Sequence, residues 1–212
     1  MSNQSDYDAL VTSGANGRFH RLTHKSLEKK YKGLHFDRVL EIGAGSGEHL
    51  PFVLHSFSEY VMSDIELPTN KISQSMVRHV IADASSLPFD DEHFDRIVVT
   101  CVLHHVSELY GSILEMKRTL KPGGVLTILL PTDPGFVFRL SRSMMGDQIL
   151  RNQGCADIDF FRSIEHRNHY VSILGILKNV FQNDDFNAFG FPFHSHFWHI
   201  NLFTAIHITK RK

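Results

Sequence analysis

The residues that most clearly indicate chemistry are three glycines at alternate positions, Gly43, Gly45 and Gly47, directly after an apolar run at residues 39–42. Glycine adopts positive φ without strain and lets another molecule approach the backbone closely. A buried parallel strand that leads into such a loop predicts contact between the backbone and a ligand. Nucleotide sites of several chemistries use loops of this kind, so the glycines alone do not specify the ligand.

Two carboxylates follow the next two predicted strands. Asp64 comes after the strand expected at residues 60–63, and Asp83 follows the strand expected at residues 78–82. In doubly wound folds, a carboxylate at the end of the second strand accepts hydrogen bonds from ribose hydroxyls. Asp64 is therefore expected to bind a nucleoside, although either aspartate could instead cap its own strand.

Strand and helix patterns alternate along the segment that must position these residues. A helix is expected at residues 107–120, an amphipathic helix at residues 18–32, and a further helix beginning near Glu48. Alternation of this kind predicts a doubly wound α/β fold with a mostly parallel sheet and helices on both faces. The first five strands are expected at residues 38–42, 60–63, 78–82, 96–101 and 125–130.

The pattern changes after Pro131. Residues 132–170 are expected to form an insertion over the ligand-binding edge of the sheet, because that edge carries the site in this architecture. A helix near residues 171–181 and strands near 186–191 and 201–209 complete the chain. We expect a single domain, residues 1–212, with a helical lid at 1–35, a cofactor-binding core at 36–131, a substrate-side insertion at 132–170 and the last helix and strands at 171–212.

Composition narrows the classes of partner. The net charge is −1 from 22 basic and 23 acidic residues, so no electrostatic footprint for nucleic acid is visible. Two cysteines in 212 residues indicate a reducing compartment, and we expect a cytoplasmic protein. The apolar runs fall short of the ~20 residues that a membrane-spanning helix needs.

A metal site is considered because His194, His196 and His199 lie close together, and the first two would share one face of a strand. No carboxylate or cysteine accompanies them at a spacing typical of zinc sites. We therefore predict no metal site.

Five separated stretches together resemble the class I S-adenosylmethionine-dependent methyltransferases. The stretches are residues 39–47, Asp64, Asp83-Ala84 before Leu87-Pro88-Phe89, Phe94-Asp95 leading to Val-Leu-His-His-Val at 102–106, and Leu-Lys-Pro-Gly-Gly at 120–124. The resemblance covers about residues 36–131 and implies a Rossmann-like, seven-stranded sheet with an antiparallel edge strand. It implies S-adenosylmethionine as the methyl donor and S-adenosylhomocysteine as the product. The residues implied to bind the donor are Glu41, Gly43, Ala44, Gly45, Gly47, Asp64, Ile65, Asp83, Ala84, Thr100, Cys101 and His105.

The resemblance gives these residues separate roles. Glu41 would lie near the ammonium of the donor, Asp64 would hold its ribose, and Asp83 with Ala84 would hold its adenine, while Thr100 and Cys101 would lie near the methyl group. A dinucleotide-binding dehydrogenase is the main alternative for this fold. Its fingerprint needs glycine or alanine three residues after the second glycine, where this chain has Glu48.

Methyl transfer to a hydroxyl would be helped by a general base, and histidine is the side chain best suited to that role near neutral pH. The candidates are His166, His169 and His105, although each could be structural. The acceptor is expected to be a small molecule, or a sugar or lipid-linked compound, with O-methylation preferred. The alternatives are an N-methyltransferase of a small molecule or phospholipid headgroup, and a non-catalytic donor-binding module. Peripheral contact with a membrane stays open, because several aromatic residues gather at 191–198.

Overall fold

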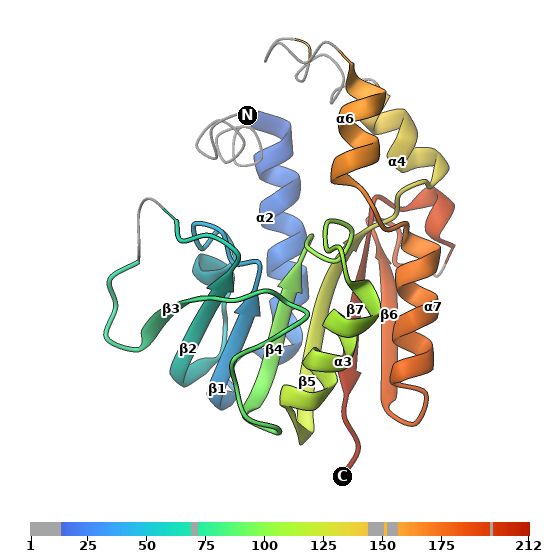
Figure 1. The fold of residues 1–212 in the computed structure, drawn as a ribbon. Coiled ribbons are helices and arrows are strands. Elements are labelled where there is room, and N and C mark those ends of the chain that lie inside the picture. Colours follow the sequence, from blue (N-terminus) through green and yellow to red (C-terminus); the bar gives the residue numbers. More distant parts are fainter. Residues whose placement is uncertain (1–13, 69–71, 144–150, 152–156, 196) are drawn as a thin grey trace.

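A computed structural model describes residues 14–68, 72–143, 151, 157–195 and 197–212 (Figure 1). Seven strands form one sheet in the order β3-β2-β1-β4-β5-β7-β6. The first five strands run parallel, and β7 pairs antiparallel with both β5 and the edge strand β6. The strands are β1 (His35–Ile42), β2 (Ser56–Asp64), β3 (Val77–Ile81), β4 (Phe94–Thr100), β5 (Leu120–Pro131), β6 (Asp185–Phe191) and β7 (Phe203–Thr209). The expected seven-stranded, mostly parallel α/β sheet is confirmed.

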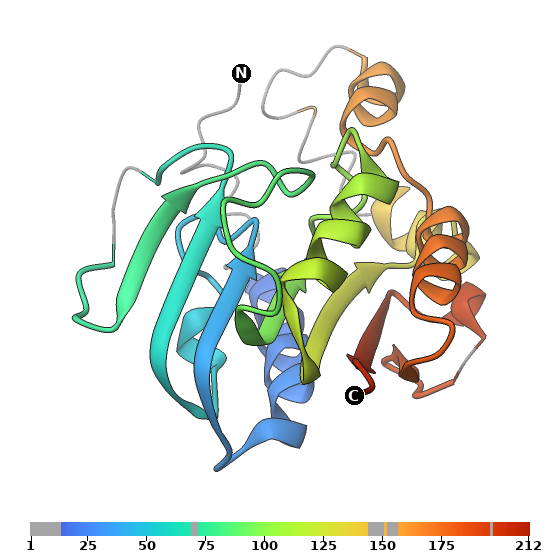
Figure 2. The ribbon, with the colours of Figure 1, turned by 60° about the horizontal axis from the view of Figure 1, so that its bottom comes forward.

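Helices cover both faces of the sheet (Figure 2). The helices α3 (Leu109–Thr119) and α7 (Tyr170–Val180) place Ile113, Met116 and Ile173 in the main hydrophobic core with β1, β4 and β5. The opposite face is covered by α2 (Gly14–Glu28), which is continued by a 3₁₀ turn, η1 (Lys29–Tyr31). The central strands are therefore buried on both faces, which explains their continuous runs of apolar residues.

One predicted helix is wrong. The segment between β1 and β2 contains a 3₁₀ turn, η2 (Leu50–Phe52), and not a helix that begins near Glu48. Only residues 43–55 connect the two strands, and the glycine loop takes up the first of them. This face of the sheet is covered by α2, which precedes β1 in the sequence.

The segment after β5 rises beyond the carboxyl ends of the parallel strands (Figure 1). It contains α4 (Phe136–Ser141) and α6 (Ile158–Glu165), and then enters α7. A last 3₁₀ turn, η4 (Trp198–Ile200), connects β6 to β7. Within the described ranges, no helix has the length and apolar character needed to span a bilayer.

Candidate active site

The glycine loop is fastened to the end of β2 by Asp64. The backbone N–H of Gly45 donates to Asp64 Oδ2 at 2.8 Å, and the N–H of Ile65 donates to Oδ1 at 2.7 Å. The N–H of Ala44 donates to the carbonyl of Ser63 at 3.0 Å. Adjacent parallel strands thus bring the loop and the carboxylate together at the edge where doubly wound sheets bind nucleosides.

Two of the three glycines are also required by packing. Gly43, Gly45 and Gly47 all have positive φ, at 67°, 51° and 90°. A Cβ at Gly43 would collide with the side chain of Val102, and one at Gly47 would lie 2.5 Å from Ile72 Cδ1. The tight loop therefore depends on glycine both for its backbone conformation and for its close contact with neighbouring segments.

Glu41 lies beneath the loop. Its side chain is buried, and its carboxylate accepts a hydrogen bond from the hydroxyl of Tyr60 at 2.7 Å. Burial raises the pKa of Glu41 above its usual value. This geometry gives Glu41 a supporting position that ties β1 to β2, and its predicted contact with the donor ammonium stays a prediction.

A buried charged network supports the loop from the α2 side, and sequence reasoning missed it. Arg96 of β4, fully buried, donates two hydrogen bonds to Glu28 of α2, one of them at 2.9 Å. His49, which follows the glycine loop, donates from Nε2 to Glu28 Oε1 at 3.0 Å. Its Nδ1 lies 2.8 Å from Nδ1 of His24, so the two rings share a hydrogen bond. Burial opposes the charge on Glu28, but the hydrogen bonds from His49 and Arg96 hold its pKa well below its usual value.

A sequence signal for this network existed. Arg96 begins the strand run that continues through Val99, and an arginine within a buried strand needs a charged partner. The partner could not be identified from the sequence, because Glu28 lies 68 residues away.

The second carboxylate that the sequence predicts to hold the donor is Asp83. Its Oδ1 accepts hydrogen bonds from the backbone N–H and the hydroxyl of Ser85, at 2.8 and 2.7 Å, and these bonds lower its pKa. Ala84 beside it is buried. The N–H of Ala82 donates to the carbonyl of Asp64 at 2.9 Å, so the two carboxylates follow neighbouring strand ends, as the sequence indicated.

The end of β4 carries Thr100 and Cys101. Cys101 has a positive φ of 57°, and its backbone N–H donates to the carbonyl of Leu129 at 2.9 Å. Burial raises the pKa of the Cys101 thiol to about 12. The thiol is therefore neutral at physiological pH and a weak nucleophile.

Beyond β4, the structure brings His105 and His166 together, with His104 beside them. The ring centroids of His105 and His166 lie 5.3 Å apart, and those of His104 and His166 lie 4.7 Å apart. Asn168 produces this arrangement, because its Nδ2 donates to the carbonyls of Leu103 and Val106 at 3.0 and 2.7 Å.

Asp133 holds the ring of His166. The Nδ1 of His166 donates to Asp133 Oδ2 at 3.2 Å, and Arg142 Nη1 donates to the same oxygen at 2.8 Å. Burial opposes the charge on Asp133, but these two partners keep its pKa below its usual value. His169 immediately precedes α7, and its side chain is exposed. The structure therefore groups two of the three predicted catalytic histidines, with His169 outside the group.

The histidines first considered as metal ligands are arranged differently. The ring of His194 stacks on Phe189, with centroids 5.5 Å apart, and the ring of His199 stacks on Trp198, with centroids 3.8 Å apart. His196 lies outside the described residues. These contacts assign His194 and His199 to aromatic packing.

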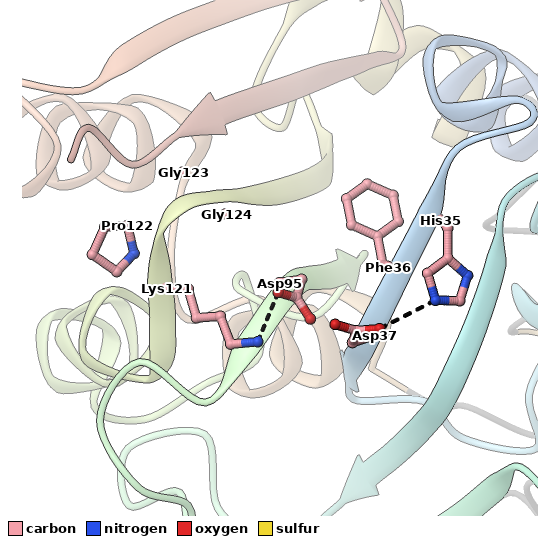
Figure 3. A pocket seen from close by; sticks show the side chains of 8 residues that line it. All are labelled: His35, Phe36, Asp37, Asp95, Lys121, Pro122, Gly123 and Gly124. Carbon is pink, nitrogen blue, oxygen red and sulfur yellow. Dashed lines mark hydrogen bonds and ion pairs between the residues drawn. The ribbon is translucent and has the colours of Figure 1, made fainter.

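A separate pocket of about 280 Å³ lies at the opposite edge of the sheet (Figure 3). It is lined by residues at the amino ends of β1, β4 and β5, including Asp37 and Asp95, and an ion pair joins Lys121 to Asp95 at 2.7 Å. Ligands of doubly wound sheets bind at the carboxyl ends of the strands. This pocket is therefore not part of the candidate active site.

Comparison with known proteins agrees with this geometry. Residues 40–128 match the methyltransferase domain family. The chain is 31% identical over 135 residues to the ubiquinone/menaquinone biosynthesis C-methyltransferase UbiE of Stutzerimonas stutzeri, covering 58% of this chain and 52% of that protein. It is 32% identical over 142 residues to the enzyme of the same name from Ectopseudomonas mendocina, covering 61% and 55%. The chain thus spans about half the length of the curated relatives it matches.

A solved structure shows the same fold along the whole chain. A putative S-adenosyl-L-methionine-dependent methyltransferase from Methanococcus maripaludis superposes with a TM-score of 0.65 at 15% identity, covering 99% of this chain and 92% of that one. The matched segment contains the glycine loop, Asp64 and Asp83. Residues 40–128 thus carry a methyltransferase domain, and the chain is similar to S-adenosylmethionine-dependent methyltransferases of the class I fold.

Proposed function

We propose that this protein transfers a methyl group from S-adenosylmethionine to a small-molecule acceptor at the carboxyl edge of the sheet. The observation that carries the proposal is the hydrogen bond from the Gly45 N–H to Asp64, which fixes a left-handed glycine loop beside a strand-end carboxylate. A nucleoside donor fits this arrangement, because a carboxylate held by backbone N–H groups still has lone pairs for ribose hydroxyls.

The donor, when bound, supplies a methyl group activated by positively charged sulfur. The protein then has to hold the donor and the acceptor in line. Alignment alone contributes a large part of the rate enhancement in such reactions. In this proposal Asp64 and the loop hold the ribose and amino-acid end, and Asp83 with Ala84 holds the adenine. The neutral thiol of Cys101 does not compete for the methyl group, because its pKa is raised to about 12 by burial.

The preference for O-methylation is not supported. The relatives with the matches described above are named C-methyltransferases. The family match ends at residue 128, before Asp133 and His166, so the acceptor side has to be interpreted from this chain's own residues. We propose an acceptor whose carbon or oxygen loses a proton on methylation, and which binds beside His105 and His166.

Exposed apolar side chains on the two helices between β5 and His166 favour an apolar acceptor. Phe136 and Leu140 of α4 are 70% and 49% exposed, and Phe160 and Ile164 of α6 are 63% and 46% exposed. A ring compound of the phenol or quinol type would meet both this apolar surface and the imidazoles. The named role of the curated relatives in quinone biosynthesis is in keeping with this class.

Calorimetry with S-adenosylmethionine and S-adenosylhomocysteine tests donor binding. Asp64→Ala should weaken binding by about 1–3 kcal/mol, the range for a lost charged hydrogen-bonding group. Asp90→Ala, which removes an exposed aspartate in the loop after Asp83, is the matched control and should leave the affinity unchanged. Unchanged affinity in Asp64→Ala, or no binding to the wild-type protein at millimolar donor, would contradict the proposal.

Release of S-adenosylhomocysteine in the presence of phenols, quinols, sugars and amines tests the acceptor class. Turnover is expected with the phenol or quinol group. Turnover with amines alone would overturn the acceptor proposal and favour N-methylation. A protein that binds the donor and turns over none of these compounds would favour a non-catalytic binding module.

A further inference from the structure

Three histidine rings converge at the carboxyl edge of the sheet. His104 and His105 come from the loop after β4, and His166 comes from the segment between α6 and α7. One ring nitrogen of each lies within 4.8 Å of those of the other two. Among the described residues, this is a grouping that sequence spacing could not reveal, because His166 is 61 residues beyond His105.

We propose that His104, His105 and His166 bind one divalent transition-metal ion, with Zn²⁺ as the best match to three imidazole nitrogens. Imidazole suits zinc and neighbouring transition metals, and sites with three protein ligands leave a fourth position open. The binding of the ion is independent of the proposed methyl transfer. Its role as an activator of the acceptor rests on that proposed function.

His166 is already oriented as a metal ligand. Its Nδ1 donates to Asp133 Oδ2 at 3.2 Å, which leaves Nε2 with its lone pair available. Metal-binding histidines generally donate their other ring nitrogen to a carboxylate in this way, and the carboxylate fixes the ring and increases its basicity. Asp133 is itself fixed by Arg142 at 2.8 Å, and its backbone carbonyl accepts from the N–H of Tyr170 at 3.0 Å.

His104 provides an independent indication of a missing partner. Its side chain is buried, with the residue only 6% exposed, and its Nδ1 has no hydrogen-bond partner among the described residues. A buried polar atom without a partner is costly, so each such atom calls for an explanation. A bound cation would satisfy it.

The geometry needs only a small adjustment. Zn–N distances of about 2.0–2.1 Å in a tetrahedral site place the ligand nitrogens about 3.4 Å apart. The present separation of up to 4.8 Å therefore has to shrink by roughly 1.4 Å at most. His105 is exposed and His104 is buried, so we expect the adjustment mainly at His105. The open fourth position would polarise an acceptor hydroxyl or enolate and lower its pKa.

Metal binding is tested on the full chain after chelation and dialysis. Titration with Zn²⁺ alone, followed by calorimetry, should show one equivalent per chain. Substitution by Co²⁺ should give the visible absorption of a four-coordinate ion. Binding of less than one equivalent of Zn²⁺, or a Co²⁺ spectrum typical of six-coordinate aqueous ion, would overturn the proposal.

Variants separate specific coordination from incidental binding. His105→Ala and His166→Ala should abolish stoichiometric binding, and Asp133→Asn should weaken it by roughly 10–100-fold, as loss of a supporting carboxylate does. His169→Ala is the matched control, because it removes an exposed histidine three residues from His166. Equal binding by His166→Ala and His169→Ala would overturn the assignment. Circular dichroism of each variant confirms that it is folded, and His105 is chosen over buried His104 for this reason.

Donor calorimetry on the same metal-free protein distinguishes this proposal from the proposed function. Donor binding without Zn²⁺ binding would overturn the metal site alone. Zn²⁺ binding that is lost in His166→Ala, together with no donor binding, would support the metal site and overturn the methyltransferase proposal.

Discussion

The proposed donor side and the proposed acceptor side of the candidate active site are held in different ways. On the donor side, Asp64 and Gly45 are 19 residues apart and meet because their strands are neighbours in the sheet. Buried charges lie beneath them. On the acceptor side, Asn168 and Leu103 are 65 residues apart and are joined by side-chain hydrogen bonds near the surface. The donor side is thus fixed by the core of the fold, and the acceptor side by a few contacts that can change without changing the sheet.

The largest effect should come from breaking the buried support of the donor side. Glu28→Gln leaves Arg96 buried without its charged partner. We expect this to lower the free energy of unfolding by about 3–5 kcal/mol, the usual cost of breaking a buried ion pair. Chemical denaturation measures the change. The exposed pair Arg78–Glu59 offers a matched control, and Glu59→Gln should cost less than about 1 kcal/mol.

A double variant tests whether the unpaired charge causes this loss of stability. Glu28→Met combined with Arg96→Met removes both charges and should recover much of the lost stability, because the penalty comes from the unpaired charge. A Glu28→Gln protein as stable as the wild type would show that the network does not support this side of the site.

The second largest effect should come from acidic pH, which should lower folding stability through a buried histidine on the face of the sheet covered by α2. Burial, with Lys30 and Arg96 nearby, lowers the pKa of His207 to about 4. The unfolded chain has the ordinary value near 6.5, so below that pH it binds a proton that the folded protein does not. Stability should therefore fall as pH drops from about 6.5 to about 4, by up to ~3 kcal/mol for this one residue.

Thermal melts across this pH range measure the effect. His207→Asn removes the titrating group and should flatten part of the slope. A melting temperature independent of pH between 6.5 and 4 would contradict the burial of a neutral His207.

The smallest of these effects on stability should come from the acceptor side. Asn168→Ala removes two hydrogen bonds, each worth about 0.5–1.5 kcal/mol. Donor affinity should stay unchanged while methyl transfer and Zn²⁺ affinity both fall, because His166 loses its anchor. Asn168→Asp keeps the volume but cannot donate, and should behave like Asn168→Ala.

Asn179→Ala, at an exposed position near the end of α7, is the control for asparagine loss within the same segment. If Asn168→Ala weakens donor binding as strongly as it reduces turnover, the two sides are not independent and the comparison fails.

The difference between the donor side and the acceptor side explains which features the sequence could predict. The glycine loop, Asp64 and Asp83 belong to local patterns with fixed spacing, and the strands that place them are apolar runs with clear boundaries. The helix expected near Glu48 was wrong because the same face of the sheet is covered by a segment from before β1. The sequence named His105 and His166 as candidates, but it could not predict that they meet, because Asn168 brings His166 to a loop more than 60 residues away.

Arg96 also limits which helix can cover its face of the sheet. An apolar strand would accept almost any amphipathic helix, in more than one register. A strand with one buried guanidinium accepts only a helix that offers a carboxylate at the right turn, and Glu28 does so in two hydrogen bonds. The pair therefore fixes the register of α2 on the sheet, as single buried polar groups fix the register of coiled coils. A graft of a related protein's first helix onto this sheet would have to keep that one carboxylate, whatever else it changed.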